Sequence, residues 1–317
     1  MQDRSNRAFE SADGELAPLV GNARYLADIS IAGMHHAVML RSPHAHARII
    51  SISTAAAERM PGVSGIFLAS HIADLQPIPC LIKLNSADGT PRADAPWSIL
   101  AGDRVRYEGE GVAWIVAETA EQAVAAAARI DVTYEVLPCA VDLASATCNA
   151  PLVWDQTPGN VVFDWEFGDR AKSDAIFARA HRIVTLEIIN NRVAPTPMET
   201  RGAIGMYSRE DDAFTLIAGT QGVHLVRRIL ADSVLQIPRD RLRVQSPRTG
   251  GGFGTKIFTY PEYALALWSS RRLGVPVRWI ATRSEGFRSD TQARVNISTG
   301  AFALDDQGNI LAIRVDA

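Results

Sequence analysis

Residues 235–256 have the sequence LQIPRDRLRVQSPRTGGGFGTK, the segment most informative about architecture. It predicts a short strand at Leu242–Gln245, a glycine-rich loop at Thr249–Lys256 and then a helix over Tyr260–Leu273. Successive glycines let a backbone approach a ligand closely and present its N–H groups as a polar cradle. From the glycines alone, a ligand cradle and a turn that only packs strand against helix are equally supported.

Two common phosphate-binding motifs do not fit this loop. A dinucleotide-binding G-x-G-x-x-G needs a final glycine, but that position is Thr255 counted from Gly250 and Ile257 counted from Gly252. A P-loop needs Gly-Lys-Ser/Thr, whereas Thr255 separates Gly254 from Lys256. An independent nucleotide-binding protein is therefore disfavoured.

On both sides of the loop the pattern predicts mixed α and β structure. Upstream, strands are expected at residues 33–40, 47–52, 63–69, 112–117 and 130–134, with a short helix from Thr54 and an alanine-rich helix at 121–129 opened by a Thr119–Gln122 capping box. Downstream, strands are expected at 180–189, 214–218 and 275–280, a helix within 222–236, and a hairpin of 295–304 with 310–315.

The last strand is expected at a sheet edge, covered by a loop or continued by another polypeptide. We predict an α/β (α+β) fold with a domain at 1–142, a linker at 143–172 and a second, incomplete domain at 173–317.

The composition excludes several classes of protein. The net charge of −3 lacks the basic excess of a nucleic-acid-binding protein. No apolar stretch has the length of a membrane span, and the polar N-terminus has no signal core, so we expect a cytoplasmic protein that does not bind membranes. Cys80, Cys139 and Cys148 are too few and too widely spaced for a zinc site, a disulfide framework or an iron–sulfur cluster.

Isolated polar residues give weaker signals. Gln221, at a predicted strand end, has an amide that can donate to an oxo ligand or a carbonyl, although an ordinary loop glutamine is the simpler interpretation. The pairs His44/His46 and His35/His36 lack further ligands nearby, so structural turns are favoured over a metal site. We predict no metal ligated by protein side chains.

In combination, these segments resemble one family. RSPHAHARI (41–49), PGVSGIFLA (61–69), VRYEGEGVAWIVAET (105–119) and VTYEVLPCAVD (132–142) are similar to the hammerhead domain of the xanthine dehydrogenase and aldehyde oxidase family. METRGAIGMYSRED (198–211) and the glycine-rich segment resemble the first part of that family's molybdopterin-binding domain, as in carbon-monoxide-dehydrogenase-like large subunits. The order of the motifs, from about residue 14 to the C-terminus, makes a chance match improbable.

The resemblance implies a molybdenum hydroxylase that oxidises an aldehyde or N-heteroaromatic carbon with oxygen derived from water. It implies that Gln221 contacts the molybdenum oxo ligand and that Gly251, Gly252, Phe253 and Gly254 lie against the pterin. The cofactor would be molybdopterin with molybdenum, in its cytosine dinucleotide form. The 2Fe–2S clusters and FAD would lie on iron–sulfur and flavin partner subunits.

Two departures from the family pattern limit this expectation. Purine-oxidising members have an acidic residue after the lysine of the loop, where this chain has Ile257, so a purine substrate is disfavoured. The family's subunit is more than twice as long, and its general base lies in the missing half, so neither Glu262 nor Glu285 is assigned that role. We therefore expect a split enzyme completed by a C-terminal molybdopterin-binding subunit, with a truncated or non-catalytic scaffold as the alternative.

Overall fold

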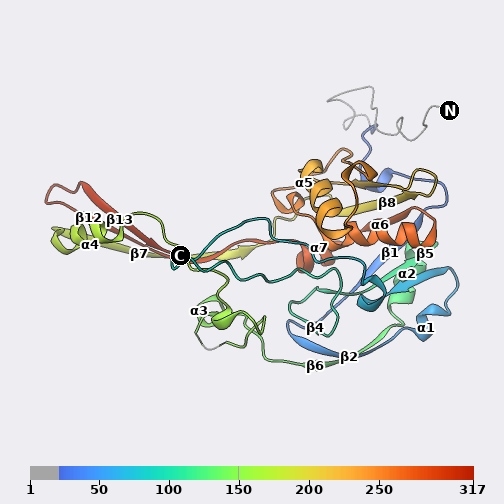
Figure 1. The fold of residues 1–317 in the computed structure, drawn as a ribbon, viewed down its shortest axis with the longest axis horizontal. Helices are drawn as coiled ribbons and strands as arrows, with labels where there is room; N and C mark the ends of the chain where they lie inside the picture. The colour runs from blue at the N-terminus through green and yellow to red at the C-terminus, as the bar shows by residue number, and fades with distance from the viewer. Residues whose placement is uncertain (1–20, 149) are drawn as a thin grey trace. The chain divides into compact units, whose positions relative to one another are not determined.

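The computed structural model describes residues 21–148 and 150–317, which form two compact units (Figure 1). The first unit comprises residues 21–79, 96–137 and 195–291. The second comprises the other described residues, within 80–95, 138–194 and 292–317. Segments from both halves of the chain thus build the first unit, which holds the glycine-rich loop.

The first unit is a mixture of strands and short helices. Its strands are β1 (His35–Arg41), β2 (Ala47–Ser53), β3 (Val63–Phe67), β4 (Arg104–Val105), β5 (Gly111–Ala117), β6 (Asp131–Val136), β8 (Gly202–Ser208), β9 (Ala213–Ala218), β10 (Leu242–Gln245) and β11 (Val277–Ile280). Its α-helices are α1 (Ala55–Glu58), α2 (Ala120–Ala127), α5 (Val223–Arg228), α6 (Pro261–Leu273) and α7 (Arg283–Ser289). The α/β class expected from the sequence is confirmed.

One seven-stranded sheet organises the first unit, in the order β10-β9-β8-β11-β1-β5-β3. The strand pairs β1/β11 and β9/β10 are parallel, and the other neighbours are antiparallel. His35 pairs with Val277, so an early strand and a late strand lie side by side in the middle of the sheet. A smaller sheet has the order β4-β2-β6.

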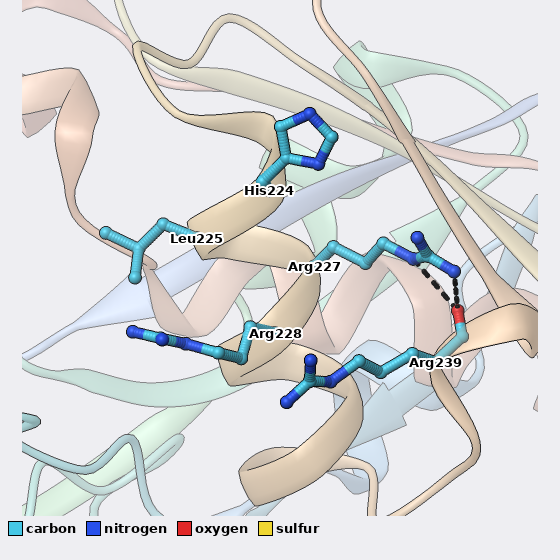
Figure 2. A pocket seen from close by; sticks show the side chains of 5 residues that line it. All are labelled: His224, Leu225, Arg227, Arg228 and Arg239. Atoms are coloured by element: carbon cyan, nitrogen blue, oxygen red, sulfur yellow. Dashed lines mark hydrogen bonds between the residues drawn. The ribbon is translucent and has the colours of Figure 1, made fainter.

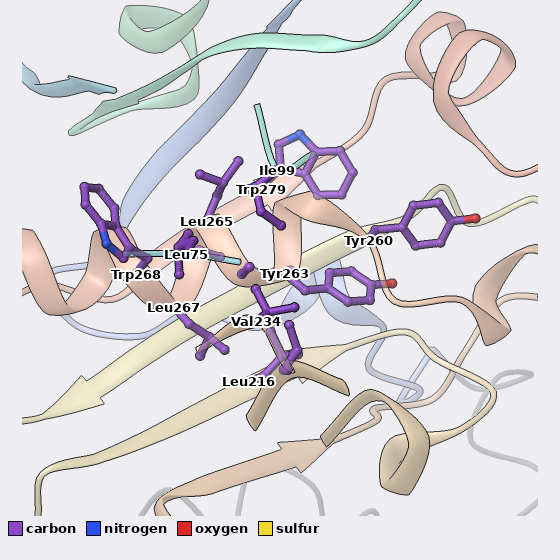
Figure 3. Packing of buried hydrophobic residues seen from close by; sticks show 14 of the residues in the cluster. Leu75, Ile99, Leu216, Val234, Tyr260, Tyr263, Leu265, Leu267, Trp268 and Trp279 are labelled. Carbon is purple, nitrogen blue, oxygen red and sulfur yellow. The ribbon is translucent and has the colours of Figure 1, made fainter. Parts of the chain in front are cut away.

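Helix α6 packs on this sheet and supplies much of the core. Figure 3 shows Tyr263 and Leu267 of α6 with Leu216 of β9 and Val234 in one buried cluster. The helix lies so close to β8 that a Cβ atom on Gly205 would come 2.3 Å from the Ala266 carbonyl carbon. A glycine is therefore required at this crossing, since any side chain would push the helix off the strand.

Most local predictions are confirmed. The Thr119 hydroxyl accepts a hydrogen bond from Gln122 N (3.2 Å), and the Gln122 amide oxygen accepts one from Thr119 N (3.0 Å), which makes the predicted capping box. The helix expected within 222–236 divides into α5 and a π-helix, Ile229–Val234. Sequence patterns missed β4, β8 and α7 in this unit, and α3 (Leu143–Ala146) and α4 (Arg170–Arg179) in the other.

The second unit contains a three-stranded sheet in the order β13-β12-β7, with two α-helices. Its elements are α3 (Leu143–Ala146), α4 (Arg170–Arg179), β7 (Arg182–Val193), β12 (Ala293–Leu304) and β13 (Ile310–Asp316). The final strand lies at an edge, as the sequence predicted. Within the described ranges, no helix combines the length and apolar character needed to cross a bilayer.

Glu110, just before β5, makes the stability of the first unit sensitive to pH. Its side chain is buried, and burial raises its pKa from 4.5 to about 7, although Arg106 N donates to Oε2 at 2.6 Å. Between pH 4.5 and about 7, the Glu110 carboxyl therefore keeps its proton in the folded state and loses it in the unfolded state. The free energy of unfolding should therefore fall as pH rises through that window, by about 3 kcal/mol at most.

Glu110→Gln should remove this dependence, because the glutamine keeps an acceptor for Arg106 N and does not titrate. The measurement is thermal or denaturant unfolding of both proteins at pH 5, 6, 7 and 8. If the free energy of unfolding changed with pH in the same way for both proteins, Glu110 would be ruled out as the titrating group.

Candidate functional site

The glycine-rich loop leaves β10 at the edge of the large sheet and leads into a turn of 3-10 helix, Thr255–Ile257, before α6. Gly251 (φ +91°) and Gly254 (φ +88°) adopt left-handed backbone conformations that favour glycine. Phe253 adopts one as well (φ +48°), and 72% of its surface is exposed. Strained non-glycine residues of this kind concentrate at functional sites.

Gln221 lies directly against this loop. Its amide oxygen accepts a hydrogen bond from Gly254 N at 3.0 Å, and its own backbone N–H donates to the Lys256 carbonyl at 3.0 Å. A Cβ atom on Gly252 would come 2.6 Å from the same amide oxygen. Since the oxygen is engaged by the loop, the amide NH₂ of this exposed residue remains as the donor toward a ligand.

The middle of the loop carries unused backbone donors. Among the described residues, the N–H groups of Gly251, Gly252 and Phe253 have no hydrogen-bond acceptor, whereas those of Gly250 and Gly254 are bound by side chains. Three successive N–H groups beside a glutamine amide form a donor cradle suited to an oxo, thiolate or phosphate-like group.

A buried arginine supports the loop from beneath. Arg201 is fully buried, and its guanidinium carbon lies 3.7 Å from the centroid of the Tyr260 ring. The Tyr260 hydroxyl donates to the Thr255 carbonyl at 2.7 Å and accepts from Thr291 N. The end of the loop is thereby fixed to the core.

Two carboxylates near this support are committed to ion pairs. Glu262 accepts from Arg201 (3.1 Å) and Arg41 (2.5 Å), and Glu285 accepts from Arg41 Nε at 2.8 Å. Burial of Glu262 disfavours its charge, but Arg201 and Arg41 outweigh that effect and hold its pKa at about 2. A carboxylate ionised this firmly is poorly suited to general-base catalysis near neutral pH.

The histidine pairs take part in local structure. The ring of His44 packs edge-on against Tyr134 with centroids 4.9 Å apart, His46 is buried, and His35 Nδ1 lies 2.7 Å from the Ser64 hydroxyl. The three cysteines are free and exposed. Across residues 21–148 and 150–317, no three His, Cys, Asp or Glu side chains gather in a way that would hold a metal ion.

A basic surface pocket of about 350 Å³ lies beside α5, lined by His224, Leu225, Arg227, Arg228 and Arg239 (Figure 2). Arg227 Nε donates to the carbonyls of Arg239 (2.9 Å) and Leu242 (2.8 Å), and Arg239 pairs with Asp232. These contacts tie α5, which follows Gln221, to the start of β10. The pocket contains none of the residues predicted to bind the cofactor.

Two family models match this chain. Residues 153–317 match the family model "Molybdopterin cofactor-binding domain", and residues 20–138 match "Aldehyde oxidase and xanthine dehydrogenase, a/b hammerhead domain". The chain belongs to the aldehyde oxidase and xanthine dehydrogenase family. Gln221 and the whole glycine-rich loop fall within the molybdopterin-binding match.

Several members of the aldehyde oxidase and xanthine dehydrogenase family are similar in sequence or structure to this chain. The carbon monoxide dehydrogenase large chain of Afipia carboxidovorans is 33% identical over 93% of this chain and 37% of its own length. The nicotine 6-hydroxylase large subunit of Paenarthrobacter nicotinovorans is 34% identical over 94% of this chain and 36% of its own. Quinoline 2-oxidoreductase of Pseudomonas putida superposes with a TM-score of 0.86 at 35% identity, over 94% of this chain and 37% of its own. The chain thus spans little more than a third of the length of these relatives.

The sequence-based prediction for this family member included Gln221 and residues 251–254, which the structure brings together. It did not include Glu199, Arg201, Lys256 or Tyr260, whose side chains fix the loop. The motif METRGA (198–203) and the lysine at the end of the loop were visible in the sequence. No short-range pattern indicated that Glu199 and Lys256 contact each other.

Proposed function

We propose that this chain contributes one face of a molybdenum-cofactor site in a multi-subunit hydroxylase. The reaction would oxidise an aldehyde or N-heteroaromatic carbon with oxygen derived from water. The observation that best supports this proposal is the position of the Gln221 amide, whose oxygen accepts a hydrogen bond from Gly254 N. Beside it lie three backbone N–H groups that have no acceptor among the described residues. Residues 1–142 would form the hammerhead domain and 173–317, after a linker at 143–172, the first part of the cofactor domain.

The residues present fit a molybdopterin cofactor. A Cβ atom at 251 would meet the Phe253 ring at 3.2 Å and one at 252 would meet the Gln221 amide oxygen at 2.6 Å, so the glycines let the loop lie against Gln221 with its N–H groups unoccupied. Gln221 would direct its NH₂ group to an oxo ligand. When bound, the cofactor would supply the Lewis acid and electron acceptor of the reaction. The pterin sulfurs would hold the metal, so no protein side chain would be needed as a ligand. We propose that the cofactor is the cytosine dinucleotide form of molybdopterin.

The remaining components would come from further polypeptide. Relatives are named "large chain" and "large subunit", which supports an assembly of several subunits, and they extend well beyond the matched region. We propose that a C-terminal molybdopterin-binding partner carries the general base. We propose that 2Fe–2S and FAD subunits carry electrons away and that the complex is cytoplasmic.

For the substrate, the names of the relatives point to small molecules. Nicotine and quinoline are N-heteroaromatic, and the chain is 34% and 35% identical to the proteins named after them. Ile257, directly after the loop, is partly exposed and carries no charge that would bind a purine. We therefore propose an N-heteroaromatic ring or an aldehyde.

Molybdenum content decides this proposal. The chain is purified alone and after co-expression with its genomic neighbours, and both samples undergo elemental analysis. Metal in the co-purified complex supports the cofactor site and justifies a screen of N-heteroaromatics and aldehydes. A soluble complex without metal, from cells with a working cofactor pathway, would instead indicate a non-catalytic scaffold.

In the assembled complex, Gln221→Ala should lower turnover roughly 100-fold while most molybdenum stays bound, because one donor to the reacting centre is lost. Gln307→Ala, in an exposed turn, is the control. Turnover and molybdenum content are measured on the same preparations. Unchanged turnover in Gln221→Ala would remove the proposed role of this amide.

A further inference from the structure

Lys256 is the last residue of the glycine-rich loop. Its side chain is 0% exposed, and Nζ lies 2.8 Å from Glu199 Oε2. Its carbonyl accepts from the Thr220 hydroxyl and from Gln221 N, both at 3.0 Å. The ammonium group is therefore committed to an internal partner.

The same Glu199 oxygen also holds the beginning of the loop. Gly250 N donates to Oε2 at 2.8 Å, and Glu199 N donates to the Gly250 carbonyl at 3.1 Å. The backbones pack so closely that a Cβ atom on Gly250 would lie 2.7 Å from Glu199 Cβ. One carboxylate oxygen thus joins Gly250, the second residue of the loop, to Lys256, its last residue.

This arrangement selects one loop conformation. A glycine-rich segment has many accessible conformations, and Phe253 at φ +48° disfavours the one observed. A buried charge is tolerated only when it is paired, so Lys256 can remain buried only where Glu199 is within reach. The cost of separating the pair therefore opposes loop opening.

We propose that Glu199 and Lys256 are positioning residues whose ion pair closes the base of the glycine-rich loop. The closed base holds the N–H groups of Gly251, Gly252 and Phe253 in the geometry that receives the molybdenum cofactor. Neither side chain touches the cofactor. This inference rests on the proposed function and deepens it, because it assigns the preorganisation of the cradle to two named residues.

Two neutral double variants separate positioning from stability. Lys256→Met with Glu199→Gln removes both charges but keeps an acceptor for Gly250 N–H, whereas Lys256→Met with Glu199→Met removes the acceptor too. Neither leaves a lone buried charge, so both should fold. Arg271→Met, which breaks an exposed pair with Asp74, is the control.

Each protein is prepared as the co-expressed complex. The readouts are pterin and molybdenum content, the thermal unfolding temperature, and hydrogen–deuterium exchange of the peptide covering 246–258. We expect the Met/Met variant to exchange faster in this peptide and to bind the cofactor roughly ten- to hundredfold more weakly. The Met/Gln variant has lost the ion pair but keeps an acceptor for Gly250 N–H, so its exchange and its cofactor content should lie between those of the Met/Met variant and the unmodified complex. The control should resemble the unmodified complex.

The proposal would be overturned if both double variants matched the unmodified complex in cofactor content and exchange, or if the Met/Gln variant alone did so, because that variant lacks the ion pair. Loss of cofactor from both, with exchange unchanged, would overturn it in favour of direct contact between Lys256 and the ligand. If the unmodified complex holds no molybdenum, the proposed function fails. The exchange difference between the double variants then still tests whether Glu199 closes the loop.

Discussion

A Gly252→Val variant is expected to fold normally and to purify with little molybdenum. The new Cβ atom would come 2.6 Å from the Gln221 amide oxygen and 2.7 Å from the amide carbon. The glutamine side chain can swing away, so the core is spared, but its amide then leaves the position beside Gly254 N from which it would donate to the cofactor. Overpacking of this kind costs about 1–3 kcal/mol, which corresponds to roughly five- to hundredfold weaker cofactor binding.

The matched control is Gly102→Val in the same unit. Gly102 is exposed, and the nearest atom to its new Cβ would be Ala69 Cβ at 4.0 Å. Molybdenum and pterin content are measured together with circular dichroism of each complex. Full occupancy in a folded Gly252→Val complex would show that no ligand lies over this glycine.

Glu262→Gln should cause the largest loss of stability of any single substitution considered. Glu262 is 2% exposed and is shared between Arg41 and Arg201. Neutralising it removes the counterion that the two buried guanidinium groups share, and leaves Arg41 with Glu285 alone and Arg201 with Asp290 alone. Removing one partner of a buried pair costs about 3–5 kcal/mol, so the melting temperature should fall on the order of 10 °C, at about 2–4 °C per kcal/mol.

Arg241→Met provides the comparison, because its pair with Asp212 is half exposed and should matter little. Differential scanning calorimetry of both variants and of the unmodified protein measures the effect. A Glu262→Gln protein that melts with the unmodified one would mean that the ion pairs do not stabilise this unit.

The parts of the structure that sequence patterns predicted are those with local causes. The Thr119–Gln122 capping box, the Leu242–Gln245 strand and the glycine-terminated helix α6 each depend on residues a few positions apart. Strand β8 was missed because Gly202 and Gly205 weaken strand propensity, and the reason for Gly205 is a helix far along the chain. Helix α7 carried a detectable signal, since Thr282 and Glu285 form its capping box.

The candidate site also has parts that the sequence predicts and parts that it does not. A glycine-rich loop and a strand-end glutamine are visible as motifs, and the family resemblance connected them. The contacts that shape the loop join residues such as Glu199 and Lys256, which lie 57 positions apart and meet only in the folded sheet. No periodicity or short motif encodes such a meeting.

The parallel pairing of β1 with β11 also has a consequence for biosynthesis. His35 acquires its partner Val277 only after about 240 further residues have been made. At about 5–20 residues per second, this edge of β1 waits unpaired on the ribosome for roughly ten to fifty seconds. Unpaired edges promote association between chains. Nascent-chain chaperones that shield this strand should therefore increase the yield of folded protein more than they would for a domain completed within its first 140 residues.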